Sequence, residues 1–256
     1  MQVSDFIAEF LVKKGVKYVY AVTGGASLHL IHSAKKNKKL KVIFPIHEQT
    51  CAMAADAYAR VSKNIGAAFA TSGPGATNLA TGICGAYFDS IPVFYITGQV
   101  STTRSKNSLE VRQIGFQETD CVQMYKNVTK YSYKIKDSSE IKYQLEKAYH
   151  LSTTGRKGPI LIDVPDNIQR EKINPKKLKS YKPNKKFNYT NDKNYKKKLI
   201  DLINKTKRPI LILGWGVHLL NSYKEINKII KKLNFPVVTT WAMSHILDDK
   251  NKLKVG

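Results

Sequence analysis

Short apolar runs alternate with helix-like segments along the first 165 residues, and this alternation restricts the fold more than any other feature of the chain. The runs at residues 93–97 and 160–163 are apolar almost throughout. Such runs are typical of strands in a parallel sheet that helices cover on both faces. Residues 48–61, which are rich in alanine, are expected to form one of the buried helices. The pattern therefore predicts an α/β fold with an open parallel sheet and helices on both faces.

A second α/β pattern begins after a lysine-rich segment. We expect residues 1–168 to form the first domain and residues 169–194, which contain Pro175 and Pro183, to form a linker. Residues 209–213 and 236–240 are strand candidates on either side of a lysine-rich helix. A single strand–helix–strand unit buries too little surface to be stable alone. The pattern therefore predicts that residues 195–256 are the incomplete start of a second α/β domain.

The formal net charge of +24 raises the question of nucleic-acid binding. Only six of the 43 basic residues are arginine, the side chain best suited to bidentate contacts with bases and phosphates. Eleven lysines are instead concentrated in residues 171–198, where they fit a solvated linker. The composition therefore predicts no specific nucleic-acid partner.

The three cysteines, Cys51, Cys84 and Cys121, are widely spaced, and none forms a C-x-x-C pair. This spacing indicates neither a zinc site nor a redox motif, and free thiols favour a reducing compartment. No apolar run reaches the roughly 18 residues that a membrane-spanning helix needs, and the first residues lack the features of a signal peptide. We therefore expect a cytoplasmic protein that does not enter the membrane and has no metal-binding cluster of its own.

Three polar segments could carry chemistry. Glu48 stands at the start of the expected alanine-rich helix, where it is either a first-turn residue that the helix macrodipole stabilises or a buried carboxylate kept for function. The glycine-rich segment 71–78 lies between a strand and a helix, where open α/β sheets bind ligands. It lacks the third glycine of a dinucleotide-binding fingerprint, because Asn78 stands there. Gln117 is either a loop amide or a donor to a substrate carbonyl.

Taken together and in order, these segments resemble the thiamine-diphosphate enzymes of the acetolactate synthase family. The resemblance covers residues 1–168, the pyrimidine-binding domain of that family, and residues 195–256 resemble the opening of its central domain. The matching segments are Thr23-Gly24-Gly25-Ala26, His47-Glu48-Gln49, Ala54-Ala55-Asp56-Ala57-Tyr58-Ala59-Arg60, Thr71-Ser72-Gly73-Pro74-Gly75-Ala76-Thr77-Asn78, Thr81-Gly82, Asp89-Ser90-Ile91-Pro92, Ile96-Thr97-Gly98-Gln99, Phe116-Gln117-Glu118-Thr119-Asp120, Gly155-Arg156-Lys157-Gly158-Pro159 and Ile162-Asp163-Val164-Pro165.

The resemblance implies roles for individual residues. In the family, the glutamate that matches Glu48 hydrogen-bonds the aminopyrimidine ring of thiamine diphosphate and thereby activates the cofactor. By the same resemblance Gln117 faces the substrate, and Gly25 lies close to the cofactor across a dimer. The implied catalytic positions are Glu48 and Gln117, and the implied cofactor-binding positions are Gly24, Gly25, Glu48, Pro74 and Asn78.

One motif of the family is missing. Family members hold the diphosphate and its Mg²⁺ in a carboxy-terminal domain with a Gly-Asp-Gly motif, and this sequence contains no Gly-Asp-Gly. We therefore expect that domain, and the Mg²⁺ ligands, to be absent from this chain. Because the family's active site forms between the domains of two chains, the resemblance implies a homodimer or tetramer with a shared site. It also allows a bound FAD, through the central domain, and a regulatory subunit.

The predicted function follows from the resemblance: a carboligase that uses thiamine diphosphate to decarboxylate pyruvate and transfers the two-carbon unit to a second carbonyl. Residues 110–115 and 239–241 depart from biosynthetic acetolactate synthases. They are closer to similar proteins associated with surface-polysaccharide genes, some of which act on keto sugars. The alternatives are therefore another thiamine-diphosphate 2-oxo acid decarboxylase or oxidase, a keto-sugar two-carbon transferase, or an inactive truncated binding module.

Overall fold

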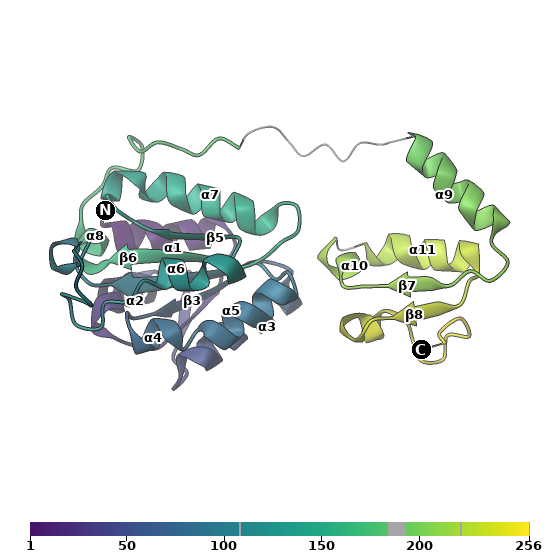
Figure 1. Cartoon of the computed structure of the whole chain (residues 1–256), viewed down its shortest axis with the longest axis horizontal. Helices are drawn as coiled ribbons and strands as arrows, with labels where there is room; N and C mark the ends of the chain where they lie inside the picture. The colour runs from purple at the N-terminus through teal and green to yellow at the C-terminus, as the bar shows by residue number, and fades with distance from the viewer. Residues whose placement is uncertain (108, 184–192, 221, 256) are drawn as a thin grey trace. The chain divides into compact units, whose positions relative to one another are not determined.

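The computed structural model describes residues 1–107, 109–183, 193–220 and 222–255 (Figure 1). The chain divides into two compact units, Met1–Lys185 and Lys186–Gly256, which we call unit 1 and unit 2 and describe separately. In the described parts of the chain, every helix is too short or too polar to cross a membrane.

Unit 1 is built on a sheet of six parallel strands in the order β2-β1-β3-β4-β6-β5 (Figure 1). All residues of the three adjacent strands β3, β4 and β6 are buried, which explains why their sequences are nearly continuous apolar runs. The predicted α/β fold with an open parallel sheet is confirmed. The strands are β1 (Tyr18–Ala21), β2 (Lys41–Ile43), β3 (Gly66–Ala70), β4 (Val93–Gln99), β5 (Tyr131–Lys134) and β6 (Ile160–Pro165).

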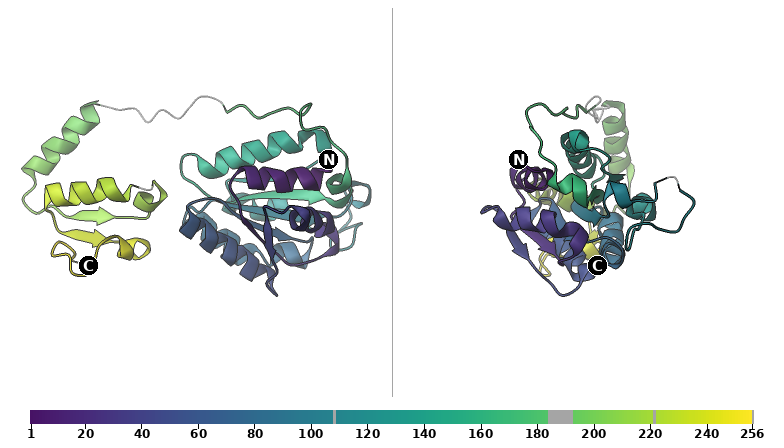
Figure 2. Two further views of the ribbon diagram at one scale, coloured as in Figure 1. Left: turned by 180° about the vertical axis from the view of Figure 1, so that it is seen from behind. Right: turned by 90° about the vertical axis from the view of Figure 1, so that its left-hand side faces the viewer.

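Helices cover both faces of this sheet (Figure 2). Because side chains alternate along a strand, Phe94 and Ile96 of β4 pack into the core beside α1. Tyr95, between them, points to the other face, where its hydroxyl donates to the carbonyl of Ala52 at 3.5 Å. One layer holds α1 (Val3–Lys13), α2 (Leu28–Lys36), α7 (Ile141–Thr153) and α8 (Asp166–Arg170); the other holds α3 (Glu48–Ser62), α5 (Ala80–Phe88) and α6 (Cys121–Tyr125), and α4 (Pro74–Thr77) precedes α5.

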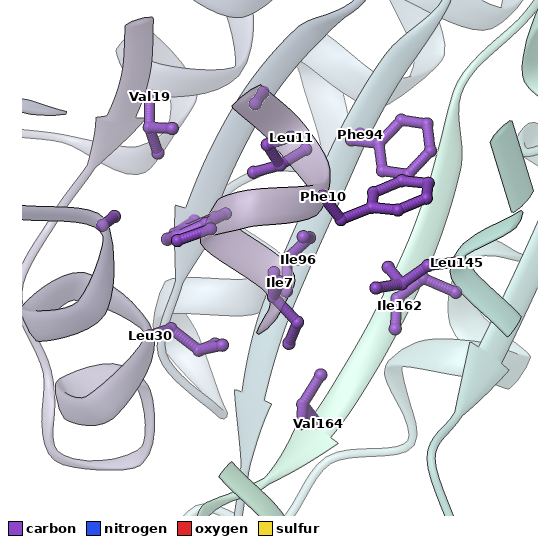
Figure 3. Close-up of a cluster of buried hydrophobic side chains, with 14 of the residues drawn as sticks. Ile7, Phe10, Leu11, Val19, Leu30, Phe94, Ile96, Leu145, Ile162 and Val164 are labelled. Atoms are coloured by element: carbon purple, nitrogen blue, oxygen red, sulfur yellow. The ribbon is translucent and has the colours of Figure 1, made fainter. Parts of the chain in front are cut away.

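The core between α1 and the sheet is the larger apolar cluster of unit 1 (Figure 3). Ile7, Phe10 and Leu11 recur at helical spacing, so one face of α1 lies on the strands. The ring of Phe10 lies 6.3 Å from that of Phe94, centroid to centroid. Full burial of a side chain such as Leu11 contributes about 1.5–3 kcal/mol, so this face fixes α1 on the sheet.

On the opposite face, small residues bring α3 unusually close to its neighbours. A Cβ added to Gly66 of β3 would lie 2.1 Å from the carbonyl oxygen of Ala55, and one added to Gly82 of α5 would lie 2.3 Å from the Cβ of Ala52. These approaches are possible only because both positions are glycine. The small residues of α3 therefore fix how closely that helix lies on β3 and α5, and Glu48 is its first residue.

The first part of the predicted linker differs from the structure, because residues 171–178 belong to unit 1 and pack on its core. Ile173 and Leu178 pack on the apolar core, and the N–H of Ile173 donates to the carbonyl of Met1 at 2.9 Å. The prediction weighed the lysines and prolines of the segment and gave no weight to its two apolar side chains. Residues 184–192 of the predicted linker lie outside the described residues.

Unit 2 contains two short parallel strands, β7 (Leu211–Leu213) and β8 (Val237–Thr239). They lie within the two segments that the sequence marked as strand candidates. A small buried core joins the strands to α11 and to the residues after β8: Leu213, Ile230, Val237 and Leu247. The helices of the unit are α9 (Lys193–Lys205), α10 (Gly216–Leu219) and α11 (Tyr223–Leu233).

Candidate active site

A pocket of about 550 Å³ opens at the carboxyl ends of the unit 1 strands. Its walls come from the segments that follow β1, β3, β4 and β6, together with the loop at residues 115–117. Parallel α/β sheets bind ligands at this edge, because strand-to-helix turns bring backbone amides and polar side chains together there. Three of the sequence-predicted residues, Gly24, Gly25 and Gln117, line this pocket.

Thr71, directly after β3, packs between two glycine-containing turns. A Cβ on Gly24 would lie 2.4 Å from the Cβ of Thr71, and a Cβ on Gly75 would lie 2.7 Å from its Cγ2. The hydroxyl of Thr71 accepts the N–H of Ala26 at 3.2 Å. Gly25, in contrast, has no atom within 4 Å of the position its Cβ would take. The packing of Thr71 therefore fixes the turn after β1 and leaves the backbone of Gly25 facing open space.

Glu48 is buried at the first position of α3, and its carboxylate has a partner. The helix begins there because His47 caps it: the His47 Nδ1 accepts the N–H of Gln49 at 3.1 Å. The side-chain amide of Asn78 donates to Glu48 Oε2 at 2.9 Å. A buried carboxylate is costly without such a bond. Both interpretations of Glu48 therefore describe its position, since it is a first-turn residue and also a buried, partnered carboxylate.

The second carboxylate oxygen of Glu48 is approached by a glycine. A Cβ on Gly75 would lie 3.2 Å from Glu48 Oε1, so a side chain at that position would crowd this oxygen. Pro74 begins α4, where a missing N–H costs nothing, and it is exposed. The predicted residues therefore fall into two groups, which Thr71 joins: Glu48, Pro74 and Asn78 in one, and Gly24, Gly25 and Gln117 in the other.

Gln117 has an unusual backbone conformation in the pocket wall. Its φ is +57°, a left-handed value that is uncommon for residues other than glycine. The loop presses its side chain against the turn after β3, because a Cβ on Gly73 would lie 2.6 Å from the Cβ of Gln117. Gly73 itself has a φ of +61°. Backbone strain of this kind concentrates at functional sites, where the surrounding structure must hold it in place.

A buried polar network lies beneath this wall. Asp163 of β6 accepts hydrogen bonds from Thr97 Oγ1 at 2.7 Å and from Gln99 Nε2 at 2.9 Å. The same Gln99 amide donates to the carbonyl of Thr119 at 2.7 Å, so the network reaches the loop that carries Gln117. Burial raises the pKa of Asp163 to about 6, and the bonds from Thr97 and Gln99 limit the increase. The sheet therefore supports the pocket wall through a carboxylate whose pKa burial raises to about 6.

The sequence analysis missed two charged residues of the pocket. Arg104 and Asp166 both line it, and the guanidinium Nη2 lies 3.8 Å from the Asp166 carboxylate. Arg104 follows the carboxyl end of β4 and Asp166 that of β6. This position after a parallel strand is the one sequence signal that could have identified them as pocket residues. Among the residues that the structure describes, no cluster of three or more His, Cys, Asp or Glu side chains is arranged to hold a metal ion.

Fold and site together define a ligand-binding α/β domain of the kind that cofactor-dependent enzymes use. Comparison with known families narrows this class. Residues 1–124 match the thiamine pyrophosphate enzyme N-terminal TPP binding domain, and residues 196–256 match the thiamine pyrophosphate enzyme central domain. The chain belongs to the thiamine pyrophosphate enzyme family, and it carries the two matched domains in the order that the resemblance implies.

Acetolactate synthases are among the proteins similar to this chain. The chloroplastic acetolactate synthase of Arabidopsis thaliana is 35% identical over 245 residues, which cover 93% of this chain and 35% of that protein. The probable acetolactate synthase large subunit of Methanocaldococcus jannaschii is 34% identical over an aligned length of 264, which covers 100% of this chain and 43% of that protein. The chain therefore spans less than half the length of these two relatives.

Proposed function

We propose that this chain supplies the aminopyrimidine-binding half of a thiamine-diphosphate-dependent carboligase. The enzyme decarboxylates pyruvate and transfers the two-carbon unit to a second carbonyl. The observation that carries this proposal is the buried Glu48 carboxylate, bonded to Asn78 beside a pocket at the carboxyl edge of the sheet. The similarity to acetolactate synthases over almost the whole chain supports pyruvate as the donor substrate.

The residues present fit the cofactor that this proposal requires. An aminopyrimidine ring offers a ring nitrogen and an exocyclic amino group, which suit a carboxylate and an amide as neighbours. Glu48 and Asn78 provide that pair at 2.9 Å, and glycine at position 75 keeps Glu48 Oε1 uncovered. The backbone of Gly25 faces open space, where a flat ring can approach closely. We assign Gly24, Gly25, Pro74 and Asn78 to cofactor binding on this basis.

Each catalytic residue then has a defined task. When bound, thiamine diphosphate supplies the nucleophilic carbon and the electron sink that decarboxylation needs. Glu48 would hold or release a proton at Oε1 towards the ring nitrogen, while the bond from Asn78 to Oε2 keeps the carboxylate oriented. The amide of Gln117, in the wall of the pocket, would donate to the substrate carbonyl as negative charge develops there.

We extend the proposal to partners and location. The site is shared between two chains of a homodimer or tetramer in the cytoplasm, a regulatory subunit can join them, and no residue of this chain is assigned to Mg²⁺ or FAD. The similarity of the chain to the acetolactate synthase large subunit of Buchnera aphidicola, 34% identical over 244 residues and 41% of that protein, supports such an assembly. Native mass spectrometry of the protein from its own cells gives the number and mass of the chains directly.

The test of this function is Glu48→Gln in the native assembly. The variant keeps an acceptor for Asn78 but cannot take up the proton, so turnover of pyruvate should fall about 10²–10⁴-fold. The rate at which the bound cofactor exchanges its C2 proton, followed by NMR, should fall in parallel. Glu9→Gln on α1 is the matched control, because Glu9 is outside the pocket lining, and it should leave both rates unchanged. Wild-type exchange in Glu48→Gln would show that Glu48 has no such role.

A further inference from the structure

The loop that carries Gln117 is folded around a single carboxylate, that of Glu118. Glu118 Oε1 accepts the hydroxyl of Ser105 at 2.6 Å and the N–H of Lys106 at 2.9 Å. Glu118 Oε2 accepts the N–H of Lys106 at 3.1 Å and the N–H of Ile114 at 3.1 Å. One side chain, next to Gln117 in sequence, therefore ties residues 105–106 to residue 114 within the connection between β4 and α6.

The Glu118 carboxylate and the groups that donate to it, which we call the clamp, are connected to the sheet as well as to the loop. The ammonium group of Lys134, the last residue of β5, donates a hydrogen bond to the hydroxyl of Ser105 at 3.1 Å, and this hydroxyl in turn donates to Glu118. Burial alone would raise the pKa of Glu118, but the bonds from Ser105 and from the amides of Ile114 and Lys106, with the nearby Lys134, lower it overall. The carboxylate is therefore ionised at neutral pH, the state in which it can accept all of these bonds.

Close packing around residues 115–118 fixes the position of Gln117 when the loop is held by Glu118. A Cβ on Gly115 would lie 2.8 Å from the carbonyl oxygen of Arg104, and the N–H of Glu118 donates to the carbonyl of Gly115 at 3.1 Å. The segment 115–118 is thus a tight turn pressed on the start of the loop. It leaves Phe116 exposed at the pocket and holds Gln117 at its left-handed φ.

We propose that Glu118 is a positioning residue for the pocket: its carboxylate closes the loop 105–118 and thereby fixes Gln117 against the glycine-rich turn after β3. This inference rests on the proposed function for the role of Gln117 at the substrate. Glu118 acts through the loop and does not itself touch substrate, since it is absent from the pocket lining. A misplacement of about 1 Å at such a position costs on the order of 10²-fold in rate.

A double-mutant cycle in the native assembly tests the inference, with Glu118→Gln, Gln117→Ala and the double variant. Gln cannot accept at both side-chain positions, so the loop should open. We expect kcat/KM for pyruvate to fall about 10²-fold in Glu118→Gln, while the Kd for thiamine diphosphate, measured by calorimetry, stays unchanged. The double variant should be no slower than Gln117→Ala alone. Wild-type kcat/KM in Glu118→Gln, or multiplicative losses in the double variant, would overturn the inference.

Glu140→Gln is the matched control. Glu140 also accepts a backbone amide, that of Lys136 at 2.7 Å, and a hydroxyl, that of Tyr133 at 3.0 Å, but these partners lie outside the loop that carries Gln117. It should leave kcat/KM unchanged. If Glu118→Gln does not fold, Ser105→Ala replaces it in the same cycle, because it removes one donor to the carboxylate and the link to Lys134.

Hydrogen exchange separates failure of this inference from failure of the proposed function. The glutamine of Glu118→Gln has one acceptor oxygen in place of two, so it cannot hold the amides of Lys106 and Ile114 as the carboxylate does. Peptides covering residues 105–117 should therefore exchange at least about tenfold faster, while the same peptides of the Glu140→Gln control should not. Unchanged exchange in these peptides refutes the clamp, whatever the enzyme does. If the wild-type assembly neither binds thiamine diphosphate nor consumes pyruvate, the proposed function fails. The exchange experiment still shows whether Glu118 holds the loop.

Discussion

Asp163→Asn should change how the stability of unit 1 depends on pH. Burial raises the pKa of the Asp163 carboxyl from 3.8 in the unfolded chain to about 6 in the fold. The folded protein therefore binds this proton more tightly than the unfolded chain does. Stability from this group is fully present below about pH 4 and is lost as the pH rises to about 6. The difference of about 2 pKa units corresponds to about 3 kcal/mol. The asparagine variant has no such titration.

The comparison between variant and wild type isolates this group. All other carboxylates are common to both proteins, so their contributions cancel in the difference of unfolding free energies. Asparagine can still accept the bond from Thr97, but its N–H group would oppose the Gln99 amide, which costs about 1–3 kcal/mol at every pH. The variant should therefore gain about 3 kcal/mol on the wild type between pH 4 and pH 7.5, on top of that constant offset.

Urea unfolding between pH 4 and pH 8 measures this difference. Both tryptophans of the chain, Trp215 and Trp241, are in unit 2, so their fluorescence follows unit 2 while far-UV circular dichroism follows the whole chain. A change in circular dichroism without a change in tryptophan fluorescence therefore reports the unfolding of unit 1. Asp137→Asn is the control with the opposite sign, because the bonds from Ser139 lower the pKa of Asp137. Parallel pH curves for Asp163→Asn and wild type would refute the argument from burial.

Two further predictions concern the same unit. Gly73→Ala should lower the free energy of unfolding by about 1–3 kcal/mol, because position 73 has a φ of +61° and its new Cβ would lie 2.6 Å from the Cβ of Gln117; urea denaturation checks this, and an unchanged midpoint would contradict it. Cys84 should react with a thiol reagent about 100-fold faster than Cys121 in the native chain, since Cys84 is partly exposed whereas burial raises the pKa of the Cys121 thiol. Peptide mass spectrometry after timed labelling measures both rates, and comparable rates would show that α6 opens readily.

The central strands could be predicted from the sequence, and an edge strand could not. Strands β3, β4 and β6 are buried on both faces, so each is a nearly continuous apolar run. Strand β5, Tyr131–Lys134, lies at the edge of the sheet and is half-buried throughout, so its tyrosines, serine and lysine show no apolar run. Its position matters to the site, because Lys134 at its end donates to Ser105. Periodicity is thus most informative where burial is complete.

The helical segment after β3 is interrupted in the structure. It forms α4 at Pro74–Thr77 and α5 at Ala80–Phe88. Asn78 lies at the interruption, and its side chain donates to Glu48 at 2.9 Å. The pairing of these two residues joins segments 30 positions apart, so local pattern cannot reveal it. The family resemblance could, because it implies that both residues contact the same ring.

The two sides of the candidate site depend on the sequence in different ways. Glu48 is placed by α3, whose position follows from its packing against the sheet at small residues such as Gly66, and Asn78, directly after α4, is bonded to it. Gln117 is placed by a loop without regular structure, which a carboxylate and one amide–carbonyl bond to the sheet hold closed. Changes in the length or sequence of that loop therefore alter the Gln117 side of the pocket, which we propose faces the substrate, while the Glu48 side stays intact. This separation allows proteins on one scaffold to keep a cofactor and differ in the carbonyl compound they accept.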